Sequence, residues 1–171
     1  SGIIVPYPGD SKKFICIGLG YMNANNMGYV IVKANSPSDV SIEGSTVQFS
    51  GHTGILGESM SAVRHANGRD WWIVAPGQCA ATSDYVHLNA WLVTPDGVQY
   101  TAPKKITPTS VYVPDDGGGN GYFKFTPDAR HFAWGPWGAG DYRLMFGNFD
   151  NSTGQFSNIR SISGHPAYGV E

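Results

Sequence analysis

The residues best suited to chemistry lie in one short stretch, His65-Ala66-Asn67-Gly68-Arg69-Asp70-Trp71-Trp72. Histidine titrates near neutral pH and serves as a catalytic base or a metal ligand, so His65 is the first candidate. A catalytic site needs convergent partners, and the sequence supplies none around His65. We therefore interpret the imidazole as structural, and we expect it to bond a turn carbonyl or the Asp70 carboxylate and so to fix a hairpin.

Other groups that could bind a metal or attack a substrate lack the spacing that such sites need. The histidines follow no metal-ligand pattern, and no serine lies in a G-x-S-x-G motif. Asp115, Asp116 and Asn120 offer oxygen ligands in a glycine-rich segment, but the spaced acidic residues and the distal glutamate of an EF-hand loop are missing. We interpret this segment as a connecting loop, and we expect no metal and no cofactor.

Two tryptophans, Trp134 and Trp137, are candidates for a binding surface. Indole faces can stack on the apolar faces of sugars while their N–H groups find polar partners. Together with Tyr85 they would mark a glycan-binding rim. The alternative is that Trp134 ends a strand and packs in the core while Trp137 covers a hairpin. The usual burial of tryptophan favours this alternative.

The elements around the His65 stretch are predicted to be strands. Asn67-Gly68 predicts a hairpin turn, because this pair takes positive φ at both central positions most readily. Residues 71–75, Trp-Trp-Ile-Val-Ala, are apolar without alternation, so both faces of that strand should be buried. No stretch has a convincing helical pattern, so other sheets must supply the cover.

The composition predicts one all-β domain. The 171 residues include 23 Gly and 11 Pro with 5 Trp, 9 Tyr and 8 Phe, and these accompany many short β-branched runs. Only 14% of residues are charged and the net charge is -2, so nothing indicates nucleic acid or a polybasic membrane contact. No apolar run approaches the roughly 18 residues of a spanning helix, so we expect no transmembrane segment.

The two cysteines lie in different settings. Cys16 is in an apolar strand, where a buried free thiol behaves as a small hydrophobe. Cys79 lies in a predicted loop. A disulfide between them stays open as the less favoured alternative, because pairing requires the Cα atoms to lie within about 7 Å.

Turn signals recur with a constant period along the chain. The first turns fall at Gly9, Gly68 and Ala129, and the later turns at Ser36, Pro95 and Asn151. A repeat of about 60 residues with four strands is typical of a solenoid or propeller. The predicted repeats are residues 1–58, 59–120 and 121–166, and residues 167–171 would begin a fourth.

Four antiparallel strands per repeat with both faces buried favour a β-propeller, in which blades stack face to face around an axis. A β-sandwich is the competing architecture, but each of its sheets has a wet face and should alternate apolar and polar residues. The predicted strands at residues 29–32, 71–75, 90–93 and 144–146 do not alternate. Because propellers close with about four to eight blades, we expect this chain to be part of a longer polypeptide.

Five segments carry a resemblance to a known family: residues 3–9, 63–72, 121–128, 149–154 and 168–171. In this order they resemble the N-terminal propeller region of large secreted proteins of gliding Bacteroidota-type bacteria. In those proteins the propeller precedes a gliding-motility-associated C-terminal sorting domain of the type IX secretion system. The resemblance covers most of the chain, and residues 65–72 are its most specific part.

The resemblance implies an exported protein, secreted or at the cell surface, in which the propeller is a non-enzymatic scaffold for protein or glycan interaction and adhesion. Its partners would be the rest of its own propeller or polypeptide and other surface proteins or glycans. No catalytic residue is carried over, because the shared motif is structural. The alternative function is a sugar-binding or enzymatic propeller whose site is completed by blades absent from this chain.

Overall fold

In the computed structural model the chain is described over residues 2–19, 27–51, 55–56, 58–78, 86–101, 104–106, 120–137 and 143–163. Every regular element within these ranges is a β-strand. The strands are β1 (Gly2–Pro6), β2 (Lys13–Leu19), β3 (Met27–Ser36), β4 (Asp39–Gln48), β5 (Ile55–Leu56), β6 (Ser61–Arg64), β7 (Trp71–Gln78), β8 (Val86–Thr94), β9 (Gly97–Tyr100), β10 (Lys104–Ile106), β11 (Asn120–Phe125), β12 (His131–Trp137), β13 (Arg143–Asp150) and β14 (Gln155–Ser163). The predicted all-β class is therefore confirmed.

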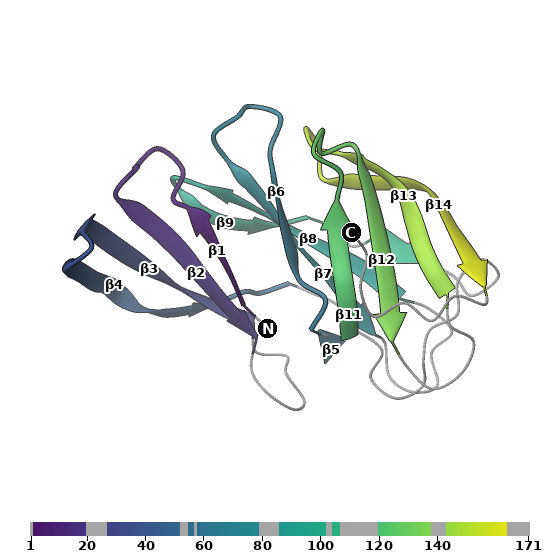
Figure 1. The fold of residues 1–171 in the computed structure, drawn as a ribbon, viewed down its shortest axis with the longest axis horizontal. Helices are drawn as coiled ribbons and strands as arrows, with labels where there is room; N and C mark the ends of the chain where they lie inside the picture. Colours follow the sequence, from purple (N-terminus) through teal and green to yellow (C-terminus); the bar gives the residue numbers. More distant parts are fainter. Residues whose placement is uncertain are drawn as a thin grey trace.

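The strands form three antiparallel sheets that lie side by side (Figure 1). The first sheet has the order β1-β2-β3-β4 and the third has the order β11-β12-β13-β14. The second sheet has six segments in four rows, because β5 and β6 both pair with β7 while β9 and β10 both pair with β8. Each sheet thus has four antiparallel rows in chain order, as the predicted repeat requires.

Some boundaries differ from the predicted ones. β5 pairs in the second sheet, so that sheet begins before the boundary predicted between residues 58 and 59. The fourth row of the second sheet is divided into two strands, β9 and β10. The sequence between them contains Pro103, which has no N–H to donate to a ladder. The predicted start of a fourth repeat, residues 167–171, lies outside the described residues.

The second sheet lies between the other two and is covered on both faces (Figure 1). On β7, Trp72 and Val74 pack in a cluster with the third sheet, whereas Ile73 and Ala75 pack in a cluster with the first sheet. All four side chains are buried. The prediction that residues 71–75 are buried on both faces is confirmed, and this burial explains why the strand lacks apolar–polar alternation.

The loops between the first and second rows of each sheet repeat at the predicted turn positions. Gly9, Gly68 and Ala129 all have positive φ, at 83°, 73° and 60°. Each loop is closed by a backbone N–H to carbonyl bond of about 2.9–3.0 Å, from Tyr7 to Lys13, from His65 to Asp70 and from Thr126 to His131. The period derived from the sequence is therefore present in the backbone.

The turn at Asn67-Gly68 differs from the predicted one. Only Gly68 has positive φ, whereas the prediction placed both residues in that region. The strands β6 and β7 are separated by residues 65–70, and this longer loop needs one left-handed residue rather than the two of a two-residue hairpin turn.

Candidate functional site

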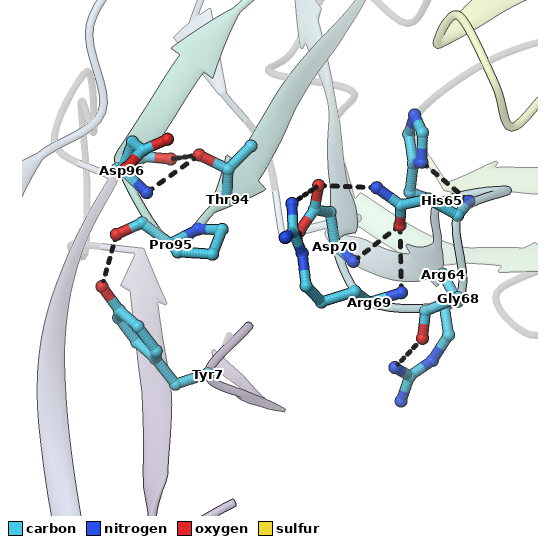
Figure 2. Close-up of polar contacts among 11 residues, drawn as sticks. Tyr7, Arg64, His65, Gly68, Arg69, Asp70, Thr94, Pro95 and Asp96 are labelled. Atoms are coloured by element: carbon cyan, nitrogen blue, oxygen red, sulfur yellow. Dashed lines mark hydrogen bonds and ion pairs between the residues drawn. The ribbon is translucent and has the colours of Figure 1, made fainter. Parts of the chain in front are cut away.

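The loop from His65 to Asp70 is fixed by its own polar groups (Figure 2). The backbone N–H of Gly68 donates to the carbonyl of His65 at 2.9 Å. The side-chain oxygen of Asn67 accepts from the backbone N–H groups of Arg69 and Asp70, both at 3.0 Å. Such a local side-chain to backbone network is what makes asparagine a turn residue. The motif thus determines the conformation of its own loop.

Asp70 is 4% exposed and both of its carboxylate oxygens are occupied (Figure 2). Arg69 donates from Nε to Oδ1 at 2.7 Å and from Nη2 to Oδ2 at 3.1 Å. The Asn67 amide donates to Oδ2 at 2.7 Å. The Arg69 guanidinium, aided by the Asn67 amide, holds the pKa of the Asp70 carboxyl below its usual range. Asp70 is therefore an ionised anchor of the loop rather than a proton donor.

This lowered pKa predicts an acid-dependent loss of stability. A group whose folded-state pKa is depressed stabilises the fold above its unfolded-state pKa of about 4, and this contribution disappears as the pH falls through the folded-state pKa. We expect Asp70→Asn to lower the free energy of unfolding at pH 7 by about 1 kcal/mol, a modest value because Arg69 is largely exposed. Urea unfolding at several pH values measures this difference.

The difference in the free energy of unfolding between Asp70→Asn and the wild type should become smaller as the pH falls below about 4. Asp128 and Asp150 also have pKa values below the usual range, because Thr126 and Ser152 respectively hydrogen-bond their carboxylates. Asp128 and Asp150 are present in the wild type and in Asp70→Asn, so the difference between these two proteins reports on Asp70. A gap of constant size from pH 7 to pH 2 would show that the Asp70 charge does not stabilise the fold.

His65 connects the second sheet to the third. Its Nδ1 accepts from the backbone N–H of Asn67 at 3.0 Å, which leaves the ring proton on Nε2. That Nε2 donates to the carbonyl of Ser152, in the β13–β14 turn, at 3.1 Å. Two partners were expected for the ring, a turn carbonyl or the Asp70 carboxylate. The ring binds a turn carbonyl, which lies in another hairpin, and the Asp70 carboxylate binds Arg69.

Trp72 makes the closest contact with the same turn. Its Nε1 donates to the carbonyl of Asn151 at 2.8 Å, and its ring lies against Phe149 with centroids 6.3 Å apart. A Cβ added to Gly154 would lie 2.6 Å from the Trp72 ring, so only glycine fits there. The backbone N–H of Ala66 also donates to Asn151. The β6–β7 loop and the β13–β14 turn are thus joined by bonds and by packing.

The first and second sheets are joined in the same way. The hydroxyl of Tyr7, in the β1–β2 loop, donates to the carbonyl of Pro95, in the β8–β9 turn, at 2.9 Å (Figure 2). In both cases the loop between the first and second rows of one sheet contacts the turn between the third and fourth rows of the next. We refer to this arrangement as the loop-on-turn contact.

The motif therefore joins sheets, and most of its polar side-chain atoms have partners; the exception is the indole N–H of Trp71, which is buried without a hydrogen-bond partner among the described residues. The ring nitrogens of His65, the carboxylate of Asp70 and the indole N–H of Trp72 all have partners within the protein. Among the described residues no group of three or more His, Cys, Asp or Glu side chains could hold a metal ion. The hydrogen bonds of His65 thus fix backbone positions in its own loop and in the β13–β14 turn.

The other candidate residues are placed differently. Trp134 is 1% exposed, and its Nε1 donates at 2.9 Å to the hydroxyl of Ser59, so it belongs to the core. The backbone of Trp137 ends β12, but its side chain lies outside the described part of the structure. Tyr85, Asp115 and Asp116 lie outside it altogether, and of Asn120 only the backbone, at the start of β11, is described.

The cysteines are described in part. Cys16 is a free thiol that is half-buried on β2, rather than fully buried as expected. Its side chain is on the face of the first sheet that points away from the second, and none of the three described sheets covers that face. Cys79 lies outside the described residues.

Sequence reasoning missed the residues that receive the motif. Asn151 supplies the carbonyl and Gly154 the space for Trp72, yet both were recognised only as turn residues. It also missed Arg69, the main partner of Asp70, and Arg64, whose guanidinium lies 4.2 Å from the Trp71 ring centroid. A usable signal was the Asx–small–Arg pattern that recurs at residues 67–69 and 128–130.

Comparison with protein-family models, with curated proteins and with solved structures gives no significant match to this chain. In the described part of the chain, no helix has the length and hydrophobicity needed to cross a membrane. The functional argument therefore rests on the loop-on-turn contacts and on the surfaces that the three sheets present.

Proposed function

We propose that this chain is a non-enzymatic β-propeller module of an exported bacterial surface protein, in which it serves as a scaffold for protein or glycan recognition and adhesion. The observation that carries the proposal is the repeated loop-on-turn contact, because it stacks successive sheets face to face in one direction. Stacked four-stranded sheets are the building principle of propellers. Recognition on such scaffolds belongs to loops at the rim.

Three observations support the scaffold role over a catalytic one. The polar side-chain groups of His65, Asp70 and Trp72 are hydrogen-bonded within the protein, the second sheet is buried on both faces, and Trp134 lies in the core with a satisfied N–H. These features rigidify the stack and leave the rim loops as the variable surface. The export and adhesion parts of the proposal come from the family resemblance of residues 65–72 and the other shared segments.

Binding assays on the purified chain test this proposal. The immobilised protein is exposed to a glycan array and to fractionated surface proteins, and the bound material is analysed for chemical change. We expect saturable binding of one ligand class with the ligand returned intact. We also expect Trp137→Ala and Tyr85→Ala to weaken that binding without changing the urea midpoint. Absence of saturable binding, or recovery of a cleaved or modified ligand, would contradict the scaffold role.

A second candidate function is favoured by a depression of about 480 Å³ between the first strands of the sheets. Its lining includes Ile3 from β1, Ser61 from β6 and Lys124 from β11, together with Glu58. A carboxylate and an ammonium in one depression could bind a polar ligand such as a sugar. If Glu58→Gln removes ligand binding while Trp137→Ala does not, the ligand site is this depression rather than the rim.

A further inference from the structure

The first sheet presents an apolar face that points away from the second sheet. Strand register places its members on one side: Ile4 pairs with Cys16, Cys16 with Val30, and Val32 with both Phe14 and Ile42. None of these side chains belongs to either core cluster, and Ile4 and Ile42 are 68% and 66% exposed. We refer to this surface as the leading face.

The leading face carries apolar residues at the positions that the other two sheets bury. Counted from the residue whose carbonyl closes the loop, Phe14, Trp71 and Phe132 are equivalent, and likewise Cys16, Ile73 and Trp134. In the second sheet these residues pack on the first sheet, and in the third sheet they pack on the second. By this equivalence the leading face has the composition of an interface between sheets.

The third sheet presents the opposite surface, which points away from the second sheet. Register places Ala133, Phe146, Leu144 and Ile162 together on it, beside Tyr122. None of these residues belongs to the core clusters. Lys124 and Arg160 flank the apolar residues, and the described strand residues of the leading face include no lysine or arginine to repel them. We refer to this surface as the trailing face.

We propose that a second copy of this chain takes the place of the further blades expected from the sequence and docks its trailing face on the leading face, so that two copies close a ring of six sheets. The proposal extends the two observed interfaces, in which the trailing side of one sheet covers the leading side of the next. A single copy holds both surfaces, so two head-to-tail contacts satisfy both copies by two-fold symmetry. Six sheets lie within the usual propeller range of about four to eight blades.

The loop-on-turn rule also gives the polar part of this contact. In the two observed interfaces, the loop between the first and second rows of one sheet contacts the turn between the third and fourth rows of the next sheet. The corresponding loop of the third sheet, residues 126–131, and the corresponding turn of the first sheet, residues 36–39, are largely exposed. In the pair, residues 126–131 of each copy would contact residues 36–39 of the other copy.

Sedimentation of the 171-residue chain tests the pairing. We expect a species of about 37 kDa, twice the 18.4 kDa of one chain. Ile42→Lys on the leading face and Ile162→Lys on the trailing face should each weaken association by roughly tenfold or more, because each places a charge in the buried interface. Val47→Lys is the matched control: Val47 is also exposed on β4, but its partner Tyr29 faces the second sheet.

Cys16 provides a second measurement within the leading face. In a Cys79→Ser background the rate of thiol modification should fall as the protein concentration rises through the dimer range, and it should stay high in Ile42→Lys. Burial raises the pKa of the Cys16 thiol, so labelling is done at alkaline pH.

A species of 18.4 kDa with concentration-independent labelling would overturn the pairing. It would leave the scaffold role standing, because that role has its own binding test. Larger assemblies that both lysine variants dissolve would support the head-to-tail contact and overturn the closed pair.

Discussion

Trp72→Ala should lower the free energy of unfolding by about 3–5 kcal/mol, the range for large aromatic residues removed from a core. Trp72 is 2% exposed, packs against Phe149 and Gly154 and donates to the carbonyl of Asn151. The substitution therefore removes both the packing and the hydrogen bond that connect the second and third sheets. Urea unfolding followed by circular dichroism measures the loss.

Trp72→Phe is the matched control for this prediction. Phenylalanine keeps most of the aromatic packing but has no N–H for the Asn151 carbonyl. We expect a smaller loss than for alanine, with about 1–2 kcal/mol from the missing hydrogen bond.

Hydrogen exchange locates the effect of Trp72→Ala. Because Trp72 joins two sheets, amides of β13 and β14 should exchange faster in the alanine variant, whereas those of β2 and β3 should change little. A loss below about 1 kcal/mol, or an equal effect on all sheets, would show that Trp72 does not couple these two sheets.

The parts of the fold that were predictable depend on local signals. Glycines at positions 9 and 68 and Asp128-Ala129 mark the loops, because the left-handed conformation and short polar side chains are local requirements. Likewise, the unbroken apolar run of β7 predicted burial on both faces, because one strand carries enough residues to show the pattern. The period, the four strands of each repeat and the buried strand could therefore be obtained from the sequence.

The parts that were not predictable depend on contacts between distant residues. His65 was expected to act within its own hairpin, but the acceptor of its Nε2 proton is Ser152, 87 positions away. Nothing near His65 in the sequence identifies that turn. The same holds for Trp134, whose partner Ser59 lies in an earlier repeat. The sequence indicated that these residues are structural, but it could not indicate which sheets they join.

Exposure of the first sheet illustrates a further limit. Strands β2 and β3 are as apolar as β7, so periodicity predicts that both of their faces are buried. The side chains of Phe14, Cys16 and Val30 are nevertheless only half-buried, because no sheet formed by the described residues lies on their side. The sequence pattern of a strand indicates which side chains are apolar enough for burial. Whether they are buried depends on the presence of a partner sheet.

Gly154→Ala should be among the most destabilising glycine substitutions in the described part of the chain. Gly154 has φ of 72°, and an added Cβ would lie 2.6 Å from the Trp72 ring. We expect a loss of about 1–2 kcal/mol from the left-handed backbone and about 1–3 kcal/mol more from overpacking. Gly68→Ala is the matched control, because its φ of 73° is nearly the same and nothing lies within 4 Å of its added Cβ.

Gly68→Ala should therefore show only the backbone term, and the difference between the two variants measures the Trp72 contact. A double-mutant cycle isolates it further. In a Trp72→Ala background the ring that opposes the new methyl group is gone, so Gly154→Ala should cost about as much as Gly68→Ala does in the wild type. Equal costs for the two glycine variants in the wild type would contradict the close approach of the β13–β14 turn to Trp72. An undiminished cost in the Trp72→Ala background would place the strain in the turn itself.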